Sequence, residues 1–225
     1  MFVTNSMTQK VVTIDKSASI FEAQKLMADH RIRHLPIVDP QGHLLGIVTD
    51  RDIRSALPYE LFREKDNAAA KQQVSRLTVA DIMTANPLTI SPMDTIQDAL
   101  LRIQKERVGA FPVVDEHNVL KGILSVRDLL RAFVNVLNIG EPGTLLCVLV
   151  EEKVGQMKRI VDAITGENVS IGSILVARYW DDNMRAVFPY VLTLNTRKVK
   201  QKLESIGFKI LDPMKWYMDQ LPKHD

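Results

Sequence analysis

A hydroxyl residue, an arginine and an aspartate recur with one spacing at two places in this 225-residue chain. The first set is Thr49, Arg51 and Asp52, and the second is Ser125, Arg127 and Asp128. At a helix start, a hydroxyl beside free backbone amides favours phosphate, and a carboxylate one turn further on accepts hydrogen bonds from ribose hydroxyls. The arginine adds positive charge for the phosphate. Both sets therefore predict nucleotide binding.

The same spacing also suits a helix cap that needs no ligand. In a capping box, the hydroxyl accepts a hydrogen bond from the amide three residues on, and the acidic side chain accepts one from the amide of the hydroxyl residue. Thr49-x-x-Asp52 and Ser125-x-x-Asp128 both fit this pattern. Spacing alone favours the cap, so the nucleotide interpretation depends on the surrounding sequence.

That surrounding sequence is an internal repeat. Residues 7–56 match residues 83–132 without a gap, and 16 of the 50 aligned pairs are identical. Each copy is too short to bury a full core alone. We therefore predict that the two copies pack together as one domain with two related clefts.

Hydrophobic periodicity predicts the order strand, helix, strand, strand, helix in each copy. The predicted strands are 11–14, 35–38 and 44–48 in the first copy and 88–90, 111–114 and 120–124 in the second, with helices beginning near residues 20, 50, 96 and 126. A break at 140–143 precedes a predicted βαββαβ sandwich. Its strands are 145–150, 174–179, 186–194 and a short one near Lys209, its helices begin near Gly155 and Arg197, and a hairpin turn is expected at 181–183.

Composition narrows the classes of function. The net charge of +2 lacks the concentrated basic field of a nucleic-acid binder, and a single cysteine, Cys147, fits a reducing compartment. We find no apolar run of transmembrane length, no metal-ligand spacing among the histidines and no catalytic constellation. The expectation is a cytoplasmic protein that is not an enzyme, with no catalytic cofactor, no metal, no nucleic-acid partner and no membrane contact.

The two copies resemble a tandem pair of cystathionine-beta-synthase (CBS) domains, the Bateman module. The resemblance is carried by a Met-Thr pair before the first strand, at residues 7–8 and 83–84, by the segments 31–39 and 107–115, and by the segments 46–52 and 122–128. The C-terminal part is similar to ACT domains, which bind small ligands and dimerise, although Val154-Gly155 stands where that family usually has Pro-Gly. The expected fold is α/β (α+β), with two βαββα units followed by a βαββαβ ferredoxin-like domain.

The resemblance also implies boundaries. They are a first CBS domain at 1–57, a linker at 58–76, a second CBS domain at 77–137, a linker at 138–143, an ACT-like domain at 144–211 and a tail at 212–225.

In the CBS family, the ribose-binding aspartate of one copy usually faces a base pocket formed by the other copy. Carried over, one site would combine Thr13, Ile14, Ile32, Arg33 and His34 with Ser125, Arg127 and Asp128. The other would combine Thr89, Ile90, Val108, Gly109 and Ala110 with Thr49, Arg51 and Asp52. Gly109 leaves room for a base, whereas Arg33 would block a base or bind a polyphosphate; a plain surface role for Arg33 stays open.

Together, repetition and resemblance favour nucleotide binding over capping alone. The implied ligand is AMP, ADP, ATP or S-adenosylmethionine, and the implied function is that of a regulator, expected as a homodimer, which signals to an unknown target protein by a change of conformation or assembly. Two alternatives remain: a dimerisation scaffold with empty clefts, and an enzyme that processes nucleotides.

Overall fold

The computed structural model describes residues 1–57, 76–177 and 183–211. The chain divides into two compact units, Met1–Arg131 and Ala132–Asp225. The predicted linker at 58–76 lies outside the described residues except for Arg76, as do Asp181, Asp182 and the predicted tail.

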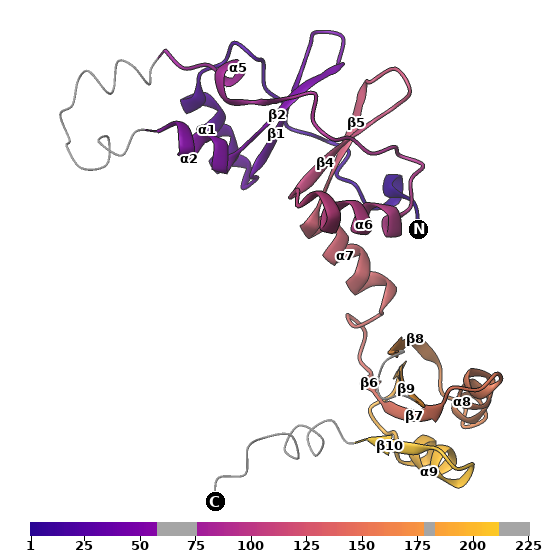
Figure 1. The fold of residues 1–225 in the computed structure, drawn as a ribbon. Coiled ribbons are helices and arrows are strands. Elements are labelled where there is room, and N and C mark those ends of the chain that lie inside the picture. The colour runs from indigo at the N-terminus through magenta and orange to yellow at the C-terminus, as the bar shows by residue number, and fades with distance from the viewer. Residues whose placement is uncertain (58–75, 178–182, 212–225) are drawn as a thin grey trace, which may run out of the picture. The chain divides into compact units, whose positions relative to one another are not determined.

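In the first unit, each copy contributes a two-stranded antiparallel hairpin and flanking helices (Figure 1). The first copy contains α1 (Ile20–His30), β1 (His34–Val38), β2 (Leu44–Thr49) and α2 (Asp50–Ala56), after a short helix η1 (Val3–Asn5). The second contains α5 (Val79–Ile82), β3 (Thr84–Ala85), α6 (Ile96–Glu106), β4 (Ala110–Val114), β5 (Leu120–Ser125) and α7 (Val126–Val136), which continues into the second unit.

The expected first strand of each copy is reduced to a single bridge. Ile14 pairs in parallel with Ile37, and its amide donates to the carbonyl of Pro36 (3.2 Å). The next ladder bond would need an N–H on Pro36, which proline lacks, so the strand cannot extend towards Val12. The second copy repeats this arrangement at Ile90 and Pro112.

The segment that opens each copy pairs with the sheet of the other copy. Thr8 and Ile123 exchange two backbone hydrogen bonds (2.9 and 3.0 Å), and β3 pairs antiparallel with β2. The missing side chain of glycine is what admits this segment: a Cβ on Gly122 would lie 2.6 Å from Met7 Sδ, and one on Gly46 would lie 2.8 Å from Met83 Sδ. This exchange joins the two copies into one unit, as predicted.

Each copy has an apolar cluster, and each cluster includes a residue from the opening segment of the other copy. The first is built around Ile14, Ala23, Met27, Leu35, Ile37, Val48, Ile53 and Val79. The second is built around Val3, Ile90, Ile96, Ala99, Phe111, Val113, Leu124 and Leu129. Because Val3 belongs to the second cluster, the N-terminal segment of the first copy completes the core of the second.

The second unit contains β6 (Thr144–Leu145), β7 (Cys147–Glu151), α8 (Gln156–Thr165), β8 (Ile171–Ala177), β9 (Met184–Val191), α9 (Arg197–Ser205) and β10 (Lys209–Leu211) (Figure 1). All strand pairs are antiparallel: β10 with β7, β7 with β9, β6 with β9, and β8 with β9. Its core joins residues of α8 and α9 to alternate residues of β7 and β9, including Val148, Ile160, Val187 and Leu203. The elements follow the order expected of a βαββαβ sandwich; the ACT assignment stays a prediction.

One predicted strand of this sheet is interrupted. The sequence predicts a continuous strand over 145–150, but β6 and β7 are separated at Leu146, which lies opposite Pro189 of β9. The Leu146 amide donates to the Pro189 carbonyl (3.0 Å), and Pro189 has no N–H to return the bond. The proline therefore breaks the ladder, although the register with β9 is the same on both sides of the break.

Candidate functional site

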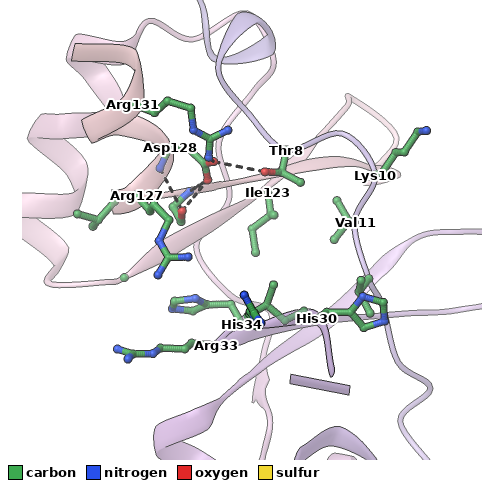
Figure 2. Close-up of a pocket in the computed structure, with 16 residues that line it drawn as sticks. Thr8, Lys10, Val11, His30, Arg33, His34, Ile123, Arg127, Asp128 and Arg131 are labelled. Carbon is green, nitrogen blue, oxygen red and sulfur yellow. Dashed lines mark hydrogen bonds and ion pairs between the residues drawn. The ribbon is translucent and has the colours of Figure 1, made fainter. Parts of the chain in front are cut away.

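A cavity of about 480 Å³ lies in the first unit, beside the start of α7 and the segment before β1 (Figure 2). Its lining residues are Thr8, Lys10, Val11, Val12, His30, Arg31, Ile32, Arg33, His34, Gly109, Ile123, Ser125, Val126, Arg127, Asp128 and Arg131. Both copies contribute, because the segment that opens the first copy crosses to β5. The cavity is thus a product of the repeat.

Asp128 is the most enclosed polar group of this cavity, with only 4% of its surface exposed. Its Oδ2 accepts hydrogen bonds from the amide (2.9 Å) and the hydroxyl (2.5 Å) of Ser125. Its Oδ1 accepts from the Thr8 hydroxyl (3.3 Å) and from Arg131 Nη2 (2.7 Å). Burial with four donors holds the carboxylate in one orientation at the cavity wall.

The capping box predicted at this place is present. The Ser125 hydroxyl accepts from the Asp128 amide (3.3 Å) while the Asp128 carboxylate accepts from the Ser125 amide. Thr49 and Asp52 form the same box at α2. The capping residues are therefore the same side chains for which ligand binding is predicted, and Oδ1 of Asp128 lies beside Thr8 and Arg131, which also line the cavity (Figure 2).

Positive charge dominates the rest of the wall. Five cationic residues line the cavity, namely Lys10, Arg31, Arg33, Arg127 and Arg131, against one carboxylate. Such an excess in a concave site attracts anions and raises their local concentration. Arginine in particular suits phosphate, because its planar guanidinium donates two parallel hydrogen bonds.

An apolar surface completes the site. Val11, Val12, Ile32, Ile123 and Val126 are all among the lining residues. An apolar wall with a few placed polar groups is typical of small-molecule pockets. The cavity can therefore receive a flat apolar ring at one part and an anionic group at another.

His34 lies where the first copy meets the second copy. A Cβ added to Gly109 would lie 2.8 Å from His34 Nε2, so the imidazole fills the space beside that glycine. Burial, and then the nearby charge of Arg33, lower the pKa of His34, while Asp52 opposes the shift. His34 is therefore held towards its neutral form at the edge of the cavity.

The structure brings together most of the first predicted set. Ile32, Arg33, His34, Ser125, Arg127 and Asp128 all line the cavity. Thr13 and Ile14 are not among the lining residues, and Ile14 is buried in the first core instead. Residues 10–12 of the same segment take their place. Binding by any of these residues stays a prediction.

The second predicted set is more scattered. Thr49 and Asp52 cap α2, Arg51 is exposed on that helix, and Thr89 is half-buried just before the buried Ile90. Ala110 is buried at the start of β4 and Val108 packs against the second core. Gly109 lines the Asp128 cavity, where His34 occupies the space that was expected to receive a base. Ligand binding by this set also stays a prediction.

Sequence reasoning missed several lining residues, chiefly Thr8, Lys10, Arg31 and Arg131. Thr8 carried a signal, because it belongs to the Met-Thr pair that both copies share. Arg131 carried a weaker one, because it stands three residues after Asp128 and therefore on the same face of α7. Arg31 carried a signal of the same kind as Thr8, because Arg107 stands at the aligned position of the second copy, whereas Lys10 aligns with Asn86 and carried none.

Two further findings concern the described part of the chain. Its helices include none long and apolar enough to span a membrane. Its His, Cys, Asp and Glu side chains form no cluster of three or more that could hold a metal ion.

Curated proteins match a little more than half of the chain. The chain is 36% identical over 129 residues to homoserine O-acetyltransferase from Methanococcoides burtonii, a match that covers 57% of this chain and 23% of that relative. The chain thus spans about a quarter of the length of this relative. It is also 31% identical over 137 residues to a CBS domain-containing protein from Dictyostelium discoideum, covering 61% of this chain and 94% of the relative.

Three solved structures also resemble more than half of the chain. The CBS domain pair of protein MJ0100, in complex with 5′-methylthioadenosine and S-adenosyl-L-methionine, has a TM-score of 0.50 and 31% identity, covering 59% of this chain and 95% of that one. CBSX2 in complex with AMP has a TM-score of 0.51 and 27% identity, covering 59% and 96%. The acetoin utilization protein AcuB from Vibrio cholerae has a TM-score of 0.53 and 26% identity, covering 62% and 95%.

The family model for the CBS domain matches twice, at residues 3–59 and 79–135. The two matches contain both capping boxes, the crossed opening segments and every residue that lines the cavity. Together they span more than half of the sequence. The chain therefore belongs to the CBS-domain family, as a protein with a tandem pair of these domains.

Proposed function

We propose that this protein is a regulator whose CBS pair binds an adenosine-containing ligand in the cavity beside Asp128. The ligand is AMP, ADP, ATP or a related adenosyl compound such as S-adenosylmethionine. Binding changes conformation or assembly, and this change is passed to a target protein. The observation that carries the proposal is the buried Asp128 carboxylate in a wall with five cationic residues.

Each part of such a ligand has a counterpart in the cavity. Asp128 Oδ1 accepts hydrogen bonds from the ribose, the apolar wall packs against the base, and the guanidinium groups bind the phosphate. The solved complexes of similar CBS pairs with AMP, 5′-methylthioadenosine and S-adenosyl-L-methionine support this class of ligand.

The regulator that we propose is not an enzyme. The match to homoserine O-acetyltransferase covers only 23% of that relative. A role in carbon metabolism, including acetoin use, is part of the proposal and is supported by the likeness to AcuB. We also propose that the second unit is an ACT-like domain that promotes a homodimer in the cytoplasm.

Isothermal titration of the full chain with AMP, ADP, ATP and S-adenosylmethionine tests the ligand. In a separate unfolding experiment, a true ligand at a concentration of about a hundred times its dissociation constant should add roughly 2.7 kcal/mol to the free energy of unfolding. Chromatography after incubation should recover the ligand unchanged. A chain that binds none of the four at millimolar concentration would be a scaffold, and one that releases a product would be an enzyme.

Asp128→Ala locates the site. It should weaken binding at least about tenfold, because hydrogen bonds to a charged acceptor are lost. Asp98→Ala is the matched control, since Asp98 forms the same capping box with Thr95 at α6 but does not line the cavity. Equal binding by both variants would refute the assignment of Asp128.

A further inference from the structure

Arg131 marks a difference between the two copies of the repeat. The aligned residue of the first copy is Ser55. Arg131 Nη2 lies 2.7 Å from Asp128 Oδ1, and 61% of the Arg131 side chain is exposed whereas Asp128 is buried. Figure 2 shows the guanidinium at the carboxylate, beside Thr8. One copy therefore places an exposed cation on its aspartate, and the other has a short neutral residue at that position.

The ion pair occupies the oxygen that a ribose needs. Ser125 holds Asp128 Oδ2 through two hydrogen bonds, which leaves Oδ1 for other donors. Thr8 and Arg131 already donate to Oδ1. A carboxylate oxygen has two lone pairs, so a ribose hydroxyl can bind Oδ1 well only by displacing one of these donors.

Arg131 is the donor that can leave. Water screens an ion pair whose cation is mostly exposed, so the pair contributes little to stability. Thr8, by contrast, is held by two backbone hydrogen bonds to Ile123. The long arginine stem can turn the guanidinium from Asp128 into the cavity that it lines.

We propose that Arg131 is a specificity-determining residue that exchanges Asp128 for the phosphate of the bound ligand. This inference rests on the proposed function and goes further, because it concerns which adenosine compounds the site accepts. When the ribose displaces Arg131 from Asp128, the phosphate of the ligand becomes the new charged partner of Arg131. A ligand without phosphate breaks the ion pair and offers no replacement. The site therefore selects phosphorylated nucleotides over nucleosides.

Titration of three probes tests the exchange: adenosine, AMP and ATP. The full chain carries Asp52→Ala, so that the Asp128 site dominates, and Arg131→Ser then introduces the residue of the first copy. With arginine, ATP should bind most tightly and adenosine most weakly. Arg131→Ser should weaken the binding of ATP and strengthen that of adenosine, so that the ratio of the adenosine dissociation constant to the ATP dissociation constant falls by about fivefold or more.

Arg54→Ser is the matched control. Arg54 forms an ion pair of the same length with Asp50 on α2 (2.7 Å), although Asp50 is exposed, and Arg54 does not line the cavity. The variant Arg54→Ser removes the same charge as Arg131→Ser and should leave the ratio of dissociation constants unchanged. Arg131→Lys keeps the charge and should preserve part of the preference for ATP. Circular dichroism confirms that each variant is folded.

The outcomes separate this inference from the proposed function. If the probes bind and Arg131→Ser leaves the ratio as it was, the exchange is refuted while the adenosine site stands. If Arg54→Ser lowers the ratio as much as Arg131→Ser does, net charge accounts for the selectivity and the exchange is again refuted. If none of the probes binds to the chain with Arg131, either with or without Asp52→Ala, the proposed function fails and this inference with it.

Discussion

Thr8 and Asp128 lie 120 residues apart in the sequence, yet the Thr8 hydroxyl donates a hydrogen bond to Asp128 Oδ1 (3.3 Å). The contact exists because the segment that opens the first copy pairs with β5 of the second. It ties the crossed strand to the carboxylate of the proposed ribose site. A substitution at Thr8 should therefore change the affinity of the proposed site for its ligand.

Thr8→Val tests this link. The variant keeps the side-chain shape but removes the donor to Asp128, so binding of AMP should weaken and the free energy of unfolding should fall by about 1 kcal/mol. Thr84→Val is the matched control from the second copy, since Thr84 is exposed on β3. Titration and urea unfolding measure both effects. Equal losses in the two variants would show that the Thr8–Asp128 bond has no special role.

Gly122→Ala should destabilise the first unit. The added methyl group would lie 2.6 Å from Met7 Sδ and 3.0 Å from the Thr8 carbonyl oxygen. Overpacking of this kind costs about 1–3 kcal/mol. A second change, Met7→Ala, should restore part of the loss but not all of it, because the carbonyl stays in place.

Gly140→Ala serves as the control for this pair. A Cβ at Gly140 meets no atom within 4 Å, so the free energy of unfolding of the Gly140→Ala chain should stay close to that of the unaltered chain. Thermal unfolding compares the three variants. A Gly122→Ala chain as stable as Gly140→Ala would contradict the close packing of Met7 on β5.

His34 should make stability depend on pH. Burial, followed by the charge of Arg33, lowers the pKa of His34 in the folded state below its usual value of 6.5. Below pH 6.5 the unfolded chain takes up a proton that the folded chain resists, so the free energy of unfolding should fall as the pH drops towards the folded pKa. Above pH 6.5 this contribution is constant.

Urea unfolding between pH 5 and pH 8 measures the effect. His34→Gln should flatten the dependence of the free energy of unfolding on pH below pH 6.5. His117→Gln removes an exposed histidine and should leave that dependence unchanged. Identical profiles for the unaltered chain and both variants would show that the burial of His34 is not coupled to folding.

The edge strand β8 in the sheet of the second unit should take part in the proposed dimer. β8 pairs with β9 on one side, and no other strand among residues 132–177 and 183–211 pairs with it. Leu175 and Val176 of this strand are exposed at 45% and 41%. An apolar edge strand of this kind favours pairing with another chain. The double variant Leu175→Lys/Val176→Lys should therefore lower the mass measured by light scattering, and an unchanged mass would contradict a dimer through β8.

Within the second unit, local sequence predicted the elements better than their continuity. The continuous apolar run at 145–150 and the helical spacing after Gly155 reappear as strands and α8. The break at Leu146 depends on Pro189, more than forty residues away, and becomes visible only when β9 is placed beside it. Periodicity describes one segment, whereas a ladder depends on the donors of its neighbour.

The sequence by itself determined the repeat, the capping boxes and the residues that both copies share. Each of these depends on residues that are near in the chain or on comparison of the chain with itself. Met7 and Gly122 show the limit of this reasoning: both were recognised as repeated residues, and only the structure shows that the sulfur of one needs the missing side chain of the other.

Tertiary structure decided which residues share the cavity. It places Thr8, Lys10 and Arg131 on the wall, buries Ile14 in a core and turns His34 towards Gly109. The physical reason is the exchange of opening segments between the copies, which sets residues of one copy against the helix start of the other. A contact made across two copies depends on how their surfaces pack, and no spacing within either copy carries that information.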